Sequence, residues 1–272
     1  MWKEFRIAVS FLTRLPLPYQ GEWDEKSFSR SSVFFPLVGL IVGILVAAVF
    51  WLSSWLGSAM LAAVCTLIAS LVITGGIHLD GFMDMCDGIF ASRGRERALE
   101  IMKDSRVGSF AVLGVIMLML LKFSLYSAYS SYWLFMSVWD QILTLIAIVG
   151  SFVFSRFIMV CCLLWFPSAR SEGLGVTIKR HVSKSAPLWG ALIMLALFAP
   201  TGYYPILIAF VIAALIMVGI AAQVNKFLHG LTGDIYGAMT ELGEAVFLLI
   251  LLIIQIILGH FEIPLQIPLS IY

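Results

Sequence analysis

Charged residues are scarce in this chain. Asp, Glu, Lys and Arg make up only 12% of its 272 residues, whereas 61% are hydrophobic and the mean hydropathy is +1.01. A soluble globular domain carries about twice that share of charge. The composition therefore excludes an ordinary soluble domain. The net charge of +1 says nothing about nucleic acid, and no nucleic acid is predicted among its partners.

Several motifs for catalysis and transport are also missing. The chain has no HExxH motif and no paired-histidine spacing, which disfavours zinc, and it has no P-loop, which disfavours an ATP-driven motor. No cleavable signal peptide is apparent. Its cysteines show no paired ligand spacing and three of them lie in apolar runs, so we expect small core residues rather than a metal site. They are Cys65, Cys86, Cys161 and Cys162.

Long apolar runs, by contrast, are abundant. About 20 such residues cross a bilayer, and the short alternation typical of a β-barrel is absent. We therefore predict an all-α fold: one polytopic integral membrane helical bundle over residues 1–272, with about seven transmembrane helices. The candidate spans are residues 33–56, 59–77, 108–128, 140–166, 187–201, 205–222 and 241–259. The fifth is short, which leaves open a re-entrant or tilted piece. The amphipathic N-terminus, cut off by Pro16 and Pro18, predicts a helix lying at the membrane interface.

Lysine and arginine are absent from every second connection when seven spans are counted. The connections near residue 57, at 129–139 and at 202–204, and the tail after 259, contain neither. Because basic loops stay in the cytoplasm, this asymmetry supports seven spans. It predicts a multi-pass protein of the bacterial inner membrane with its large loops and active site facing the cytoplasm. The bases on that side are Lys3, Arg6, Arg14, Lys26, Arg30, Arg93, Arg95, Arg97, Lys103, Arg106, Arg170, Lys179, Arg180, Lys184 and Lys226.

Two further bases lie inside predicted spans. A charge at mid-membrane costs about 2.5–3.5 kcal/mol on insertion scales, so Lys122 and Arg156 need an explanation. Either side chain could reach an interface along its apolar stem. The alternative is a cation that faces a polar cavity and binds substrate there.

Three aspartates interrupt the apolar sequence in "HLDGFMDMCDG", residues 78–88. At about 100° per residue, Asp84 lies about 40° and Asp87 about 20° from Asp80, so all three share one stripe of a helix. A solvated acidic face is one interpretation. The other is a Mg²⁺ site, because Mg²⁺ binds a few carboxylates together with substrate phosphates. His78, just before the acids, is a candidate for orienting a phosphate or a carboxylate.

The segment that follows, "RGRERALEIMKDSRVG", is basic. Arginine offers forked donors to phosphate oxygens, so an acidic stripe followed by this segment is typical of a diphosphate substrate. The same bases are also the positive-inside signal. We expect Arg93, Lys103 and Arg106 to contact substrate.

A second polar stretch, "GLTGDIYGAMTELGE", covers residues 230–244. Asp234 and Glu241 are seven residues apart and share a helical face, and Glu244 lies further round. A helix cap and first turn would explain Asp234. Two more acids running into an apolar span favour a functional role for this stretch.

These segments together resemble the cobalamin synthase family. "FLTRLPLP", "FFPLVGLIVG", "GGIHLDGFMDMCDG", "RERALEIMKDSRVGSFAVLG", "ARSEGLG" and "GLTGDIYGAMTELGE" each look like segments of that family, in order and over nearly the whole chain. The resemblance implies a Mg²⁺-dependent membrane transferase late in cobalamin biosynthesis. Such an enzyme joins adenosylcobinamide-GDP to α-ribazole, or to its 5′-phosphate, and releases GMP.

The resemblance also suggests a role for each candidate residue. Asp80, Asp84 and Asp87 would hold Mg²⁺ on the diphosphate, while Arg93, Lys103 and Arg106 would neutralise the departing phosphate. Asp87 or Asp234 would take the proton of the attacking ribazole 3′-hydroxyl. Asp234, Glu241 and Glu244 would complete the metal shell or line the ribazole pocket. A homo-oligomer, and association with other enzymes of the cobalamin pathway, are left open.

Two other classes compete with this interpretation: another membrane transferase with an Asp-rich metal site, either a CDP-alcohol phosphotransferase or a prenyltransferase, and a cation transporter. A CDP-alcohol phosphotransferase would carry an Ala-Arg pair soon after its first Asp-Gly, whereas Ile89 and Phe90 follow the acids here. A prenyltransferase would carry two similar Asp-rich loops, and the second stretch is too sparse. A cation transporter would hold its acids at mid-membrane, whereas these cluster at the ends of spans.

Overall fold

The structure, a computed structural model, describes residues 1–17, 21, 24–91, 94–131 and 133–259. In these ranges all regular structure is helical, apart from one isolated bridge between Ser168 and Leu231. The α-helices are α1 (Trp2–Leu12), α2 (Glu25–Arg30), α3 (Phe35–Ser54), α4 (Ala59–Thr74), α5 (Ile77–Phe90), α6 (Arg95–Ile101), α7 (Ser109–Ser130), α8 (Val138–Trp165), α9 (Leu174–Arg180), α10 (Ala186–Phe198), α11 (Tyr204–Leu228) and α12 (Gly233–Ile257). Short 3₁₀ turns span Ser31–Phe34, Trp133–Phe135 and Ala199–Thr201.

The prediction of a polytopic helical fold is confirmed, but the count of seven spans is not. Five helical segments of the described chain are long and apolar enough to cross a membrane: Glu25–Ser54, Ser109–Phe135, Val138–Trp165, Tyr204–Leu228 and Gly233–Ile257. Helices α4 and α5 pass the same test only as a pair bent by 95°, which would make a sixth. The predicted fifth span is the shorter apolar helix Ala186–Thr201.

The bend between α4 and α5 is built from two glycines. Gly75 has φ +67° and Gly76 has φ +70°, a left-handed conformation that side chains disfavour. The Gly75 amide still bonds to the oxygen of Leu71 and ends α4. Because α5 departs at 95° from α4, the acidic stripe leaves the direction of the preceding span.

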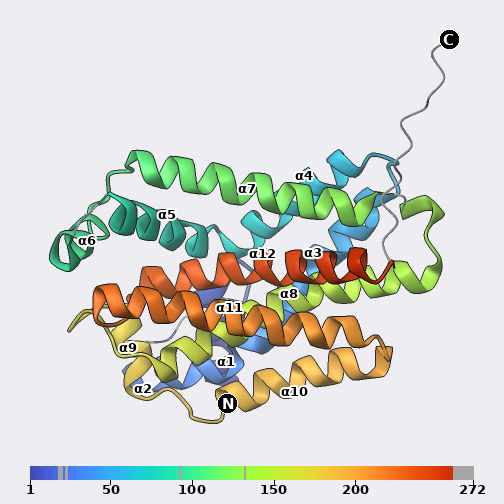
Figure 1. Ribbon diagram of the computed structural model, residues 1–272. Helices are drawn as coiled ribbons and strands as arrows, with labels where there is room; N and C mark the ends of the chain where they lie inside the picture. The colour runs from blue at the N-terminus through green and yellow to red at the C-terminus, as the bar shows by residue number, and fades with distance from the viewer. Residues whose placement is uncertain (18–20, 22–23, 92–93, 132, 260–272) are drawn as a thin grey trace.

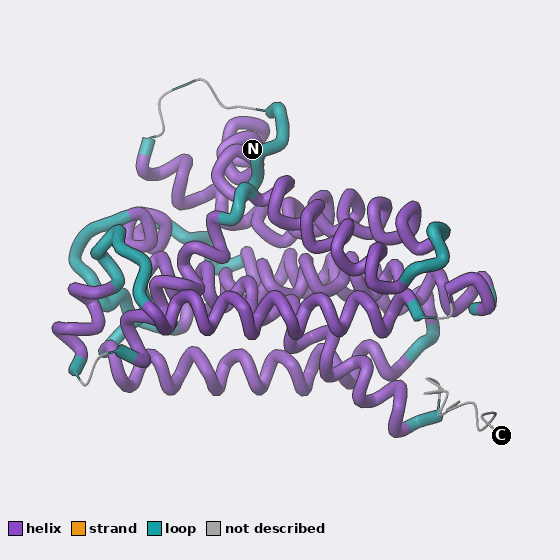
Figure 2. The backbone as a smooth tube through the Cα atoms, turned by 90° about the horizontal axis from the view of Figure 1, so that it is seen from above, coloured by secondary structure: helices purple, strands orange, loops and turns teal. Residues whose placement is uncertain are grey.

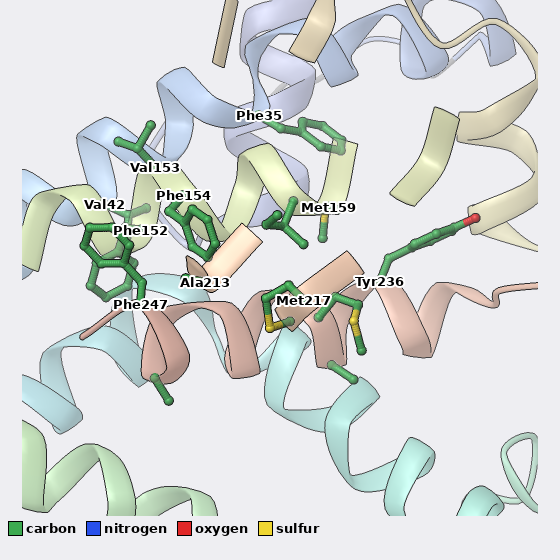
Figure 3. Close-up of a cluster of buried hydrophobic side chains, with 14 of the residues drawn as sticks. Phe35, Val42, Phe152, Val153, Phe154, Met159, Ala213, Met217, Tyr236 and Phe247 are labelled. Carbon is green, nitrogen blue, oxygen red and sulfur yellow. The ribbon is translucent and has the colours of Figure 1, made fainter. Parts of the chain in front are cut away.

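Helix α8 is the centre of the bundle. It packs against α3, α10, α11 and α12. Of the 18-residue apolar stretch of this helix, 83% is buried inside the structure. Glycines on α3 allow the close approach: a Cβ at Gly39 would lie 2.5 Å from the backbone oxygen of Phe152. Side chains of α3, α8 and α12, among them Val42, Phe152 and Phe247, fill the core there (Figure 3).

The connections fall into two groups at opposite ends of the bundle. Helices α6 and α9 and the α11–α12 connection lie at one end, on the left of Figure 1, and the α7–α8 and α10–α11 connections lie at the other. This grouping is the one that the distribution of lysine and arginine predicts. The predicted N-terminal helix is α1, which ends before Pro16 and buries Ile7, Val9 and Leu12 against one flank of the bundle (Figure 2).

Candidate functional site

The two polar stretches meet where α5 contacts the first turn of α12. A Cβ at Gly81 would lie 2.7 Å from the backbone oxygen of Asp234, and a Cβ at Gly237 would lie 3.2 Å from that of His78. Glycine at both positions therefore lets the two helix backbones touch. As a result, Asp84 lies close enough to Asp234 and Asp80 to be repelled by both.

We predict that Gly81→Ala destabilises the protein, because the added methyl group meets backbone rather than a flexible side chain. Overpacking of this kind costs about 1–3 kcal/mol. Gly219→Ala is the matched control, since a Cβ there meets no atom of the described chain within 4 Å. Thermal unfolding in detergent should show a lower melting temperature for Gly81→Ala only. Equal melting temperatures for both variants would contradict the close contact of α5 and α12.

The first cavity of the site brings the acidic stripe and the basic segment together. It measures about 210 Å³ and is lined by Asp80, Asp84 and Asp87 on one side and by Lys103 and Arg106 on the other. Along the stripe, Asp80 is exposed, Asp84 half-buried and Asp87 buried. The cavity therefore brings the acidic stripe into one space with Lys103, Asp104 and Arg106.

Arg106 is paired within its own loop. Its guanidinium contacts Asp104 at 2.5 Å, and 88% of its side chain is exposed. Hydrogen bonds from the side chain and backbone of Arg106 lower the pKa of Asp104 to about 2, so this acid is ionised at neutral pH. Arg93, the other predicted substrate contact of this segment, lies outside the described residues.

Asp87 caps the start of α7, a structural role that its position in the acidic stripe did not predict. Its two carboxylate oxygens accept hydrogen bonds from the backbone amides of Gly108, at 2.6 Å, and Ala111, at 2.8 Å. These amides belong to the first turn of α7, where donors lack partners within the helix and a negative charge is favourable. Asp87 thus fixes the start of α7 against α5.

A second cavity, of about 300 Å³, is also lined by Asp80. It is bounded by α5, α9, the start of α12 and the segment before α9, and its polar lining includes His78, Arg170, Asp234 and Tyr236. Arg170 pairs with Asp234 at 3.1 Å. Asp80 also lines a third cavity, of about 400 Å³, together with Arg14. One exposed carboxylate therefore borders all three cavities.

The intramembrane bases form ion pairs with acids of the second polar stretch. Lys122 Nζ lies 2.5 Å from Glu241 Oε2 and 2.7 Å from Glu244 Oε2, and Arg156 bonds to the other oxygen of Glu244. All four side chains are buried. Among the described residues that line the three cavities, none of these four appears. The structure thus pairs with one another four residues that the sequence suggested as substrate contacts.

Sequence reasoning missed Arg170, Tyr236 and Arg14. The sequence identified Arg170 and Arg14 only as cytoplasmic bases. It predicted no role for Tyr236, which lies within the second polar stretch, residues 230–244. No periodicity or motif singles them out. Their importance follows from the cavities that they line.

The chain has many relatives. The family model of cobalamin-5-phosphate synthase matches residues 4–252. An adenosylcobinamide-GDP ribazoletransferase of Desulfitobacterium hafniense (strain Y51) is 36% identical over 247 residues, covering 89% of this chain and 94% of the relative. Enzymes of the same name from Brevibacillus brevis and Herpetosiphon aurantiacus are 36% and 34% identical over 91% and 96% of this chain, and over 96% and 99% of their own lengths. No solved structure matches it.

Proposed function

The chain belongs to the cobalamin-5-phosphate synthase family, and on that premise we propose that it joins adenosylcobinamide-GDP to α-ribazole or its 5′-phosphate. The 3′-oxygen of the ribazole forms a bond to the phosphorus next to cobinamide. The bond from that phosphorus to the bridging oxygen breaks, and GMP leaves with the electron pair. The products are adenosylcobalamin, or its 5′-phosphate, and GMP.

One observation carries the proposal: acids and bases distant in sequence border adjoining cavities that share Asp80. One cavity, with Asp84, Lys103 and Arg106, suits a diphosphate, and the other leaves room for an acceptor. Positioning and charge neutralisation are the main contributions that a protein makes to such a transfer. In this arrangement Lys103 and Arg106 neutralise the phosphate of the departing GMP.

The donor set fits a magnesium ion. Mg²⁺ commonly uses one or two carboxylates together with substrate phosphates, and we assign Asp80 and Asp84 to it. Among the described residues no group of three or more His, Cys, Asp or Glu side chains is placed so that it could hold a metal ion, so the substrate phosphates would have to supply the remaining ligands. Bound Mg²⁺ would offset the charge of the diphosphate. Asp87, which was also a predicted ligand, is already engaged with α7.

Of the two carboxylates nominated as the base, we favour Asp234. It lines the second cavity, where the acceptor would lie, and it is half-buried beside Arg170. Asp87 lines only the first cavity and accepts two backbone hydrogen bonds.

We further propose that the enzyme lies in the bacterial inner membrane with this site at the cytoplasmic face. The basic connections and the acidic stripe are at the same end of the bundle (Figure 1), and basic loops stay in the cytoplasm.

Release of GMP by the purified protein tests the proposal. The protein in detergent would be given adenosylcobinamide-GDP and α-ribazole with MgCl₂ or with EDTA, and GMP and corrinoid product would be quantified. We expect equal amounts of GMP and product with Mg²⁺ and neither with EDTA. GMP release without a ribazole-containing product would overturn the proposal, as would product formation that EDTA does not affect.

A further inference from the structure

The second cavity holds three polar side chains with hydrogen-bonding atoms that lack a partner among the described residues. Both ring nitrogens of His78, the hydroxyl of Tyr236 and two guanidinium nitrogens of Arg170, Nε and Nη2, are buried and bond to no described residue. His78 and Tyr236 are each only 3% exposed. The three residues come from α5, α12 and the segment before α9, and all of them line this cavity.

Buried polar atoms are nearly always hydrogen-bonded. Unpartnered atoms on three side chains that line one cavity therefore indicate a ligand that supplies their partners. Tyr236 supports this, because its hydroxyl points away from the apolar cluster of the bundle core (Figure 3). Its ring is held from the side by Gly175, where a Cβ would lie 3.3 Å from the ring.

The rest of the lining is mixed, because Asp80, Glu172, Thr232 and Asp234 stand beside a larger number of apolar residues. Phe11, Met159 and Leu163 are among the lining residues, and the volume is about 300 Å³. That is the lower end of the range for small-molecule sites. A corrinoid ring is too large for it. A flat apolar base attached to a ribose fits both the volume and the lining.

We propose that this cavity binds the nucleoside acceptor, with the benzimidazole base of α-ribazole against the apolar walls and its ribose near Arg170, His78 and Tyr236. This inference rests on the proposed function. Asp80 borders both this cavity and the one assigned to the diphosphate, so an acceptor bound here has its ribose next to the phosphorus that it attacks. Arg170 and Tyr236 are then specificity-determining residues for the acceptor.

Equilibrium binding of α-ribazole to the purified full-length protein, with no corrinoid donor present, tests the inference. Tyr236→Phe removes only the hydroxyl, and Arg170→Gln removes the charge. Tyr204→Phe is the matched control, because Tyr204 begins α11 at the opposite end of the bundle and is 54% exposed. Since one lost hydrogen bond to a ligand weakens binding by about tenfold, we expect that loss or more for Tyr236→Phe and Arg170→Gln. We expect none for Tyr204→Phe, and unchanged binding of adenosylcobinamide-GDP by all three.

Three outcomes separate this inference from the proposed function. Unchanged α-ribazole binding in both cavity variants would overturn the acceptor pocket even if the wild type releases GMP. Weakened binding of adenosylcobinamide-GDP or GMP instead of α-ribazole would assign the cavity to the donor, which also overturns it. A wild type that releases no GMP but binds α-ribazole through these residues would sustain the pocket and disprove the proposed function.

Discussion

Replacing Asp84 with alanine is expected to lower turnover by about 10²–10³-fold or more while the protein still inserts and folds. Asp84 lies near enough to Asp80 and Asp234 to interact with both electrostatically, and it lines the cavity that is also lined by Lys103 and Arg106. Its loss would remove a carboxylate from the proposed Mg²⁺ site just where the diphosphate must bind. The side chain is half-buried at a cavity rather than in the core, so stability should change little.

The measurement for Asp84→Ala is the initial rate of GMP release across a range of Mg²⁺ concentrations, with the melting temperature measured in the same detergent. Asp140→Ala is the matched control, because Asp140 is an exposed acid at the start of α8, at the other end of the bundle. The control should retain the wild-type rate. An Asp84→Ala protein that keeps most of its activity at every Mg²⁺ concentration would rule out the assigned role.

Replacing Lys122 with methionine is expected to destabilise the bundle by about 3–5 kcal/mol, because it leaves an uncompensated buried charge. The wild type balances Lys122 and Arg156 against Glu241 and Glu244, in an ion-pair network that joins α7, α8 and α12. Without Lys122, Glu241 loses its ion-pair partner in the described structure, and Glu244 keeps only Arg156. Thermal unfolding should show a clear fall in melting temperature and a poor yield of folded protein.

A double variant separates a structural role of Lys122 from substrate binding. Lys122→Met with Glu241→Gln restores the balance of charge, because Arg156 and Glu244 remain as one pair. If the network is structural, the double variant regains most of the lost stability and also regains activity. A double variant that is stable but inactive would instead support the substrate contact first suggested by the sequence.

Helical periodicity in the sequence predicts which acids of the site share one face of a helix, but not which residues of other helices they contact. Asp80, Asp84 and Asp87 lie on one stripe because a helix repeats every 3.6 residues, and α5 covers that stretch. The capping of α7 by Asp87 depends on amides at Gly108 and Ala111, more than 20 residues later. Such a contact depends on how α5 packs against α7, which local periodicity does not encode.

The buried charges illustrate the same limit. Lys122 and Arg156 could be recognised from the sequence as residues that need a partner, because charges inside apolar spans are costly. Their partners could not be identified, because Lys122 and Glu241 are 119 positions apart and three other spans predicted from the sequence lie between them. No role in the site could be predicted for Arg170, because a base in a basic loop is already explained by the excess of Lys and Arg in cytoplasmic loops.

The number of spans was the weakest part of the fold prediction. Residues 59–77 were counted as one full crossing, but α4 ends at Thr74, and Gly75 and Gly76 then turn the chain by 95°. The apolar run at 187–201 corresponds to α10 with its following turn and is also short. Hydropathy reports composition along a window, and it does not report where a helix ends or bends.

Anomalous diffraction from crystals grown with Mn²⁺ and a GDP-linked substrate analogue would test the central claim most directly, because Mn²⁺ replaces Mg²⁺ and marks its own position. The account predicts a Mn²⁺ peak beside Asp80 and Asp84, with the diphosphate between it and Lys103 and Arg106. A Mn²⁺ ion bound instead to Glu241 and Glu244, or a diphosphate at the opposite end of the bundle, would contradict it.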